Sequence, residues 1–504
     1  MELVRSPIRS RAGSPRAPVV LAFAWTAALL IALAVARQSY GLAVTLTGCL
    51  AACLAPAATL RHGSVALLVL SPLLLLPLGG EESLTNLTLP ALLIPVLWVA
   101  WALVRFGAGR GIHVRDTIGG CLAALVAWEV LSVVVHWSAY PSRLDAVFAP
   151  AVLLLSVSPY WLLKTAVADL PGDAEAWLRN MARLVYPVAL ALAGWMSAEF
   201  AAGGAAFWKT NAVIVSLKWS QPGVFFGGLI CVLGAYLLAG RPARWLQVGA
   251  LPVLAMLIWG VGLAWARAWF VGLWVGACVL LYLYRRWMGL ACALASVLLV
   301  ALWPPARMVA EDVFTDRRLT YTLNRMMLWE AGWEAALESP AVGSGPGVAA
   351  RSWGVDPSTR PGAGVRTSAH NVFLDTAGEL GFPGLAILLV LLGAAFQRLR
   401  RAMRTGRGQL LGVLGMAGTA YFAALVVVSL FNEDLISIGS TATLDFLRTH
   451  IHKWALLGMV TGLMARAQRE RWRGAGGSDT SLPLLVHPLP SRAKPTEPDD
   501  GNGR

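Results

Sequence analysis

Charged side chains are scarce in this sequence, and acidic ones are the scarcest. Only 13% of the 504 residues are charged while 57% are hydrophobic, a balance that excludes an ordinary soluble domain. Asp and Glu number 27 against 41 Lys and Arg, which leaves a net charge of +14. A positive excess can indicate nucleic-acid binding, but these arginines stand singly or in small clusters between apolar runs. We therefore exclude a nucleic-acid partner and attribute the charge to membrane topology.

Several motifs that carry chemistry are also absent. The six cysteines show neither CxxC nor Cys/His spacing, which argues against a zinc or redox site. No glycine-rich nucleotide loop follows a strand and no repeat of fixed period occurs, so an ATP-driven machine is disfavoured. The early polar loops lack paired carboxylates apart from the acidic stretch GGEESLTN, residues 79–86. We expect no metal site and no cofactor.

Apolar runs are abundant instead. Most are about 17 to 22 residues long, enough for a helix to cross roughly 30 Å of hydrocarbon. They predict an all-α, polytopic membrane bundle of about twelve to fourteen transmembrane helices. The N-terminal run is long for a signal peptide and is followed at once by another span, so we expect it to be retained. The predicted spans are 18–36, 41–60, 64–79, 87–104, 117–135, 146–163, 183–200, 222–239, 245–265, 268–284, 288–303, 381–397, 410–430 and 451–466.

The distribution of basic residues predicts the orientation of these spans. With the N-terminus in the cytoplasm, basic segments such as QRLRRAMRTGRG and RAQRERWRG fall on the cytoplasmic side, as the positive-inside rule requires. The predicted parts are a cytoplasmic N-terminal segment (1–17), an N-terminal transmembrane bundle (18–303), an external periplasmic loop (304–380), C-terminal transmembrane helices (381–466) and a disordered cytoplasmic tail (467–504).

The external loop is predicted to contain a helix of about twenty residues over LTYTLNRMMLWEAGWEAALE. Met326, Trp329, Trp333 and Leu337 form an apolar stripe along it, which predicts packing on the membrane surface or against the bundle. Ser339-Pro340 should end the helix. The following GSGPG, residues 343–347, is a tight turn whose N–H groups either cradle phosphate oxygens or simply connect two elements.

The stretch SAHNVFLDTAGELGFPG, residues 368–384, predicts a second external helix that begins with Ser368 as its N-cap. His370 then lies in the first turn, and a Gly-Phe-Pro-Gly break follows Leu380. An imidazole in this position can act as a general base, because it titrates near neutral pH. The alternative is a capping or interfacial histidine.

Two arginines stand apart from the basic clusters. Arg267 lies between two apolar runs in GLAWARAWFVGLW, and Arg325 lies on the predicted external helix. An arginine at a membrane boundary must reach water or pair with an anion. The two residues therefore form either interfacial anchors or a two-arginine clamp for a lipid-linked diphosphate.

Three local patterns resemble the O-antigen ligase and O-antigen polymerase superfamily of bacterial envelope polysaccharide enzymes. The first is an arginine at the outer end of a span, here Arg267. The second is an arginine followed by Trp and Pro-x-x-Gly-x-Gly, here Arg325, Trp329 and PAVGSGPG. The third is His-Asn-x-x-Leu with Glu-x-Gly-x-x-Gly, here HNVFLDTAGELGFPG. The resemblance covers about residues 220–466.

The resemblance implies a metal-independent, inverting glycosyltransferase of the bacterial inner membrane. Its donor would be an undecaprenyl-diphosphate-linked glycan and its acceptor a lipid or glycan hydroxyl, with membrane lipids around it. The residues matching the family's catalytic positions are His370 as the base and Arg267 and Arg325 as the diphosphate clamp. The implied substrate-binding residues are Asn371, Trp329, Gly343 and Gly345. The family's Asn-Pro-Asn-like element is replaced by KWSQPGVFFGG, which puts donor contacts from that side in doubt.

Two other functional classes stay open at this stage. A secondary transporter would show charges buried within spans, for which Glu129 in AWEVLSV is the main candidate. A metal-dependent glycosyltransferase that uses lipid-phosphate sugars would show paired carboxylates early in the chain.

Overall fold

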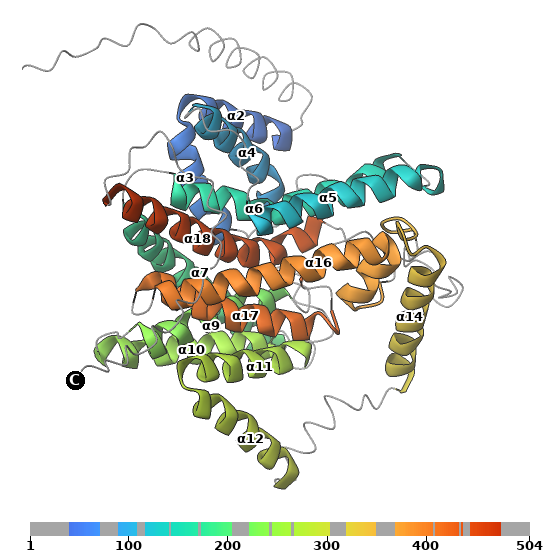
Figure 1. Ribbon diagram of the computed structural model, residues 1–504. Helices are drawn as coiled ribbons and strands as arrows, with labels where there is room; N and C mark the ends of the chain where they lie inside the picture. The colour runs from blue at the N-terminus through green and yellow to red at the C-terminus, as the bar shows by residue number, and fades with distance from the viewer. Residues whose placement is uncertain are drawn as a thin grey trace, which may run out of the picture.

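The computed structural model is a bundle of α-helices, most of them running along one common direction (Figure 1). It describes residues 40–70, 89–107, 116–140, 143–169, 173–203, 221–240, 244–263, 267–302, 319–348, 368–406, 409–432, 435–436 and 444–474. Within these ranges there are fourteen α-helices, one short 3-10 helix and no strand. The predicted all-α membrane fold is therefore confirmed.

The helices follow the apolar runs of the sequence. Their bounds are α2 Tyr40–Leu54, α3 Pro56–Leu70, α4 Leu89–Gly107, α5 Thr117–Val135, η1 Trp137–Ala139, α6 Arg143–Ala168, α7 Ala174–Gly203, α9 Gln221–Ala239, α10 Arg244–Leu263, α11 Arg267–Tyr284, α12 Arg286–Leu302, α14 Leu319–Glu338, α16 Val372–Thr405, α17 Leu410–Val428 and α18 Leu444–Gly474.

The helices support a multi-pass membrane protein. Five segments of the described residues are long and apolar enough to cross a bilayer, in α5, α6, α7, α16 and α17, and shorter apolar helices accompany them. The predicted span 41–60 is wrong, because α2 ends at Leu54 and α3 begins at Pro56. A proline fits the first position of a helix, where its missing N–H is not needed. The predicted span 18–36 and the acidic loop 79–86 lie outside the described residues.

Three helices are joined by an ion-pair cluster at one end of the bundle, which we call the ion-pair end. The carboxylate of Asp169, just after α6, lies 2.7 Å from Arg105 of α4 and 2.8 Å from Arg469 of α18. Burial would raise the pKa of Asp169, but the hydrogen bonds and charges of Arg469 and Arg105 outweigh it and hold that pKa below its usual value. The predicted topology places all three residues on the cytoplasmic side.

The C-terminal helix α18 packs in parallel along α6, and glycines allow the close approach. A Cβ at Gly462 would lie 2.7 Å from the carbonyl oxygen of Lys164, and Gly458 meets the backbone of Tyr160 in the same way. Small residues at helix contacts are typical of membrane bundles. Because α18 continues to Gly474, the predicted disordered tail begins too early at 467; residues 475–504 lie outside the described part.

Helix α17 is buried between two antiparallel neighbours, α11 and α16. Gly415 and Gly418 of α17 contact Leu399 of α16, while Gly272 and Gly276 of α11 contact the region around Ala424. These contacts fix which helix ends meet. The end of the bundle opposite the ion-pair end contains the last turn of α17, the first turn of α11 and the N-terminal part of α16.

Candidate functional site

Helix α16 contains a break that divides it into a short segment and a long one. Gly381 has φ +72° and ψ −179°, outside the helical range, and the chain resumes a helix through Pro383 to Thr405. The predicted Gly-Phe-Pro-Gly break is thus present.

The short segment begins at Val372, later than predicted, because Asn371 rather than Ser368 is its N-cap. The Asn371 side-chain oxygen accepts from the N–H groups of Phe373 at 3.0 Å and Leu374 at 3.3 Å.

His370 immediately precedes this cap and is exposed. Its φ is +51°, the one positive value found at a non-glycine residue in the described part of the chain. A left-handed conformation is unfavourable for L-residues and is often concentrated at functional sites. The hydroxyl of Ser368 accepts the N–H of His370 at 2.8 Å and donates to the carboxylate of Asp375 at 2.9 Å.

The histidine turn is attached to the end of α17. The N–H of Val372 donates to the carbonyl oxygen of Ser429 at 3.0 Å. The hydroxyl of Ser429 is buried and finds no hydrogen-bond partner in the described part of the chain. We name this end of the bundle, defined by His370, Val372 and Ser429, the histidine end.

Helix α14 covers the histidine turn from outside. Ala369, next to His370, packs in one apolar cluster with Ala335, Leu328 and Trp329 of α14. The Nε1 of Trp329 is buried and, among the described residues, has no hydrogen-bond partner. Arg325 stands one helical turn before Trp329 on the same helix and is exposed. The structure therefore brings the helix that carries Arg325 into contact with the residue beside His370.

Apart from Trp329, the predicted apolar stripe of α14 is not its buried face. Met326, Trp333 and Leu337 are each about half exposed or more, whereas Ala335 and Ala336 are buried. Trp333 makes an edge contact with the ring of Phe382. Of the two placements that the stripe allowed, the membrane surface fits the exposed residues, since small alanines make the contact with the bundle.

Arg267 is the first residue of α11, and its side chain lies outside the described residues. The antiparallel packing of α11 on α17 places this first turn beside the end of α17, at the histidine end. Trp269 anchors it there, fully buried and stacked on Tyr421 with ring centroids 6.5 Å apart. Arg267 on α11, Arg325 on α14 and His370 just before α16 thus lie toward the same end of the bundle, with α17 packed against both α11 and α16.

The GSGPG turn packs on the break in α16. The N–H of Ser344 donates to the carbonyl oxygen of Gly378 at 2.9 Å, and the N–H of Gly345 donates to that of Glu379 at 3.2 Å. The N–H of Gly343 donates back to the carbonyl oxygen of Ser339, just after α14, at 2.9 Å. These N–H groups are used by the protein itself, so the geometry favours the connecting role over a phosphate cradle. A substrate role for Gly343 and Gly345 stays a prediction.

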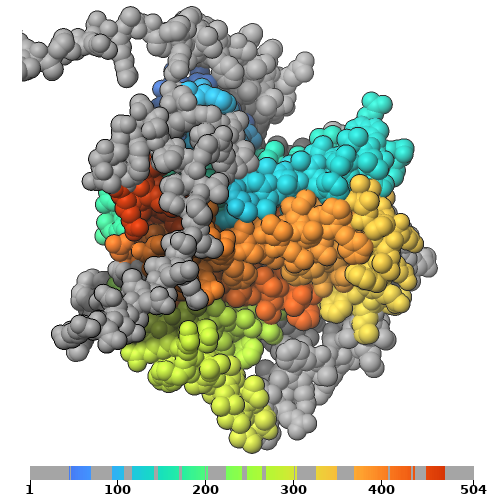
Figure 2. Space-filling model, viewed as in Figure 1, coloured from blue at the N-terminus to red at the C-terminus, as the bar shows by residue number. Residues whose placement is uncertain are grey.

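Helix α5 holds the turn and the break together, side by side with α16 (Figure 2). The hydroxyl of Ser132 lies 2.8 Å from the carbonyl oxygen of Val342 and 3.2 Å from that of Glu379. The Nε1 of Trp128 donates to the carbonyl oxygen of Leu380 at 2.8 Å. Sequence reasoning missed these contacts; the signal available was a pair of polar groups four residues apart in an apolar run.

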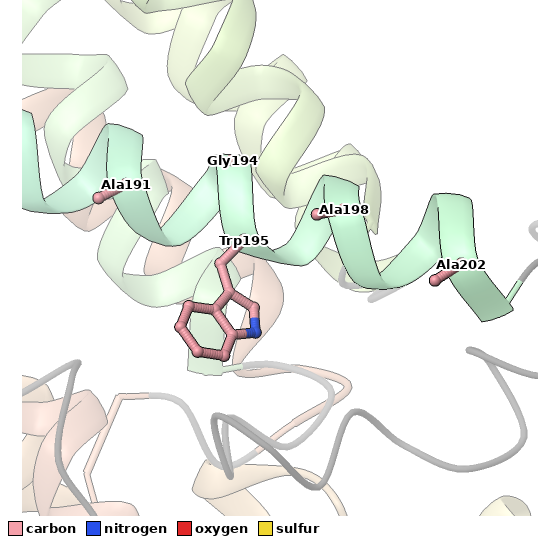
Figure 3. A pocket seen from close by; sticks show the side chains of 5 residues that line it. All are labelled: Ala191, Gly194, Trp195, Ala198 and Ala202. Carbon is pink, nitrogen blue, oxygen red and sulfur yellow. The ribbon is translucent and has the colours of Figure 1, made fainter.

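Other places in the structure offer less chemistry. Among the described residues, no three His, Cys, Asp or Glu side chains come together as a metal site requires. A surface hollow lies along α7, where Ala191, Gly194, Ala198 and Ala202 line one side beside Trp195 (Figure 3). Its lining is almost entirely apolar, so this hollow has no group that could act on a substrate.

The sequence of residues 227–389 matches the model of a family described as O-antigen ligase. This region covers about a third of the chain and includes Arg267, Arg325, His370 and the break in α16. The match confirms the predicted family resemblance. No curated protein matches the chain.

Proposed function

We propose that this protein belongs to the O-antigen ligase family and that it transfers a glycan from an undecaprenyl-diphosphate carrier to an acceptor hydroxyl, with His370 as the general base. The family match supports an O-antigen ligase or polymerase type of function in general. The observation that carries the residue roles is the packing of the histidine turn against α14 and α17 at one end of the bundle. Those contacts set the histidine turn beside α14, the helix of Arg325, and beside the end of α17, on which α11 with Arg267 packs.

In the proposed reaction, the acceptor oxygen bonds to the anomeric carbon of the donor sugar while the bond from that carbon to the diphosphate oxygen breaks. His370 accepts the proton of the acceptor hydroxyl. Undecaprenyl diphosphate leaves with the bonding electron pair, and Arg267 and Arg325 neutralise its charge. A single displacement of this kind inverts the anomeric centre and needs no metal ion. The proposed location is the outer face of the bacterial inner membrane.

Two buried polar groups support the proposal that a ligand binds at the histidine end. The Trp329 Nε1–H and the Ser429 hydroxyl flank the histidine turn, and neither has a hydrogen-bond partner among the described residues. Buried polar groups are rarely left unsatisfied in folded proteins. A substrate with many oxygens, such as a glycan diphosphate, can supply the missing acceptor and donor.

The arginine clamp is tested by replacing each arginine and measuring transfer from purified donor. Arg325→Ala and Arg267→Ala should each lower kcat/KM for the donor by about 10- to 100-fold, because a hydrogen-bonded charge contact is lost. Lysine at either position should recover part of this, since it keeps the charge but not the two-point contact. Arg179→Ala is the matched control, an exposed arginine near the start of α7 that pairs with Glu175. Wild-type donor kinetics in both alanine variants would refute the clamp.

Chelation of metal ions distinguishes a metal-dependent glycosyltransferase from the metal-independent enzyme proposed here. The wild-type protein should retain full transfer activity in EDTA, because arginines take the place of a cation at the leaving group. Loss of activity that magnesium or manganese restores would favour the metal-dependent alternative.

The transporter alternative rests on Glu129, which is fully buried in α5. Buried carboxylates within spans often belong to ion pathways. Glu129 lies next to Trp128, which contacts the break in α16, so its position is also compatible with a role near the histidine end. Purified protein that moves the lipid-linked glycan across vesicles but never forms a glycosidic bond would favour transport.

A further inference from the structure

The carboxylate of Asp375 is buried directly beneath the histidine turn. One oxygen accepts the hydroxyl of Ser368 at 2.9 Å, and the other accepts the N–H of Ala369 at 2.8 Å. Ser368 in turn accepts the N–H of His370 at 2.8 Å. Asp375 is 2% exposed, so it meets these donors in a low-dielectric environment where charge-assisted hydrogen bonds are strong.

We propose that Asp375 is the positioning residue of the site and that it holds His370 in the left-handed conformation needed for proton transfer. The inference rests on the proposed function, in which His370 is the base. Asp375 holds the N–H of Ala369 directly. It holds the N–H of His370 indirectly, through the hydroxyl of Ser368. It contacts no reacting atom in this role.

The helix itself does not require this carboxylate. Asn371 already caps the first turn by accepting from Phe373 and Leu374, and the N–H of Val372 is satisfied by Ser429. The hydrogen bonds of Asp375 to Ser368 and Ala369 fix a segment that lies before the helix. That segment carries the positive φ of His370, a conformation that is uncommon for residues other than glycine.

The test compares variants by kcat, by KM for the lipid-linked donor and by melting temperature. Asp375→Asn keeps one acceptor oxygen and replaces the other with an NH2 donor, so the Ser368 hydroxyl loses its charged acceptor and holds His370 less firmly. Ser368→Ala breaks the same link from its other side with a smaller change in the core. We expect kcat per folded protein to fall by about 10- to 100-fold in both, with KM within about threefold, as for a misplaced catalytic group. Asp375→Glu retains two acceptor oxygens and should recover part of the rate.

Thr376→Val is the matched control, because Thr376 is the next residue, is equally buried and bonds only within the helix, to Val372 at 2.6 Å. It should transfer glycan at the wild-type rate. A role limited to folding would instead reduce the amount and melting temperature of the Asp375 and Ser368 variants while leaving kcat per folded protein unchanged.

The inference is overturned if Asp375→Asn and Ser368→Ala keep kcat within about twofold of wild type, or if Thr376→Val loses as much as they do. His370→Asn, assayed beside them, separates this failure from that of the proposed function. If the His370 variant is inactive but the Asp375 and Ser368 variants transfer glycan normally, the positioning role of Asp375 is refuted and the role of His370 as base is kept. If the His370 variant is fully active, His370 is not the base, and the positioning role of Asp375 is refuted as well.

Discussion

Replacing His370 with Asn should abolish glycan transfer while leaving the fold intact. Asparagine is among the residues that best tolerate a positive φ, so it can keep the +51° conformation of this position. It cannot accept a proton at neutral pH. The expected loss is about 10²- to 10⁴-fold in kcat, the usual contribution of a general base. Transfer from purified undecaprenyl-diphosphate glycan, measured against protein that elutes as a single folded species, gives the result.

The comparison with His370→Ala sharpens this test. Alanine removes both the imidazole and the tolerance of the left-handed conformation, so any additional loss of stability in that variant reports on the backbone. If His370→Asn transfers glycan at the wild-type rate, the imidazole has no part in the reaction. The base would then have to be sought elsewhere, and the function proposed for the histidine end would lose its central residue.

The second large effect is expected at Gly343, where the GSGPG turn meets the break in α16. Gly343 has φ +70°, and a Cβ there would overlap the backbone of Glu379 and Leu380. Gly343→Ala must therefore push the turn away and disrupt the hydrogen bonds from Ser344 and Gly345 to α16. The left-handed conformation alone costs roughly 1–2 kcal/mol for alanine, and the overlap adds to it. We expect a clear drop in melting temperature together with loss of transfer.

Gly393→Ala is the control for this substitution. Gly393 lies in the long segment of α16, and a Cβ there would meet nothing within 4 Å. Alanine in a helix interior is favoured over glycine by roughly 0.5–1 kcal/mol, so this variant should be as stable as wild type or slightly more so. A Gly343→Ala protein that melts and transfers like Gly393→Ala would show that the turn is not needed to hold the break.

Some local structure could be predicted from the sequence because its signals are also local. The helix that became α14 was predicted over the same residues, since Ser339-Pro340 stops it within the sequence itself. The break after Leu380 followed from Gly-Phe-Pro-Gly for the same reason. Long apolar runs likewise predicted the helices of the bundle.

The N-cap of α16 shows where such reasoning fails. Ser368 and Asn371 are both favourable cap residues, and nothing nearby in the sequence separates them. In the structure the Ser368 hydroxyl donates to Asp375, and Asn371 caps the helix. The carboxylate that binds Ser368 is only seven residues away, but no capping pattern predicts this hydrogen bond, so only the folded structure reveals it.

The contacts of the turn were harder still to foresee. Its glycines signalled free N–H groups, but the acceptors for Ser344 and Gly345 are carbonyl oxygens exposed by the break more than thirty residues later. Trp128 and Ser132 are more than two hundred residues from their partners. The gathering of His370 and the arginine-bearing helices was expected from the family resemblance, not from spacing, and their catalytic roles stay proposals.

The Asp169 cluster also bears on how the chain is made. Arg105 and Asp169 come from the first half of the sequence, whereas Arg469 lies on α18, the last of the described helices. During synthesis the first two residues emerge long before the third, so the bundle cannot close at this end until translation is nearly complete. A chain that stops before Arg469 would leave the largely buried Asp169 carboxylate with Arg105 as its one ion-pair partner among the described residues at this end, a defect that cellular proteases can use to distinguish unfinished protein from finished protein.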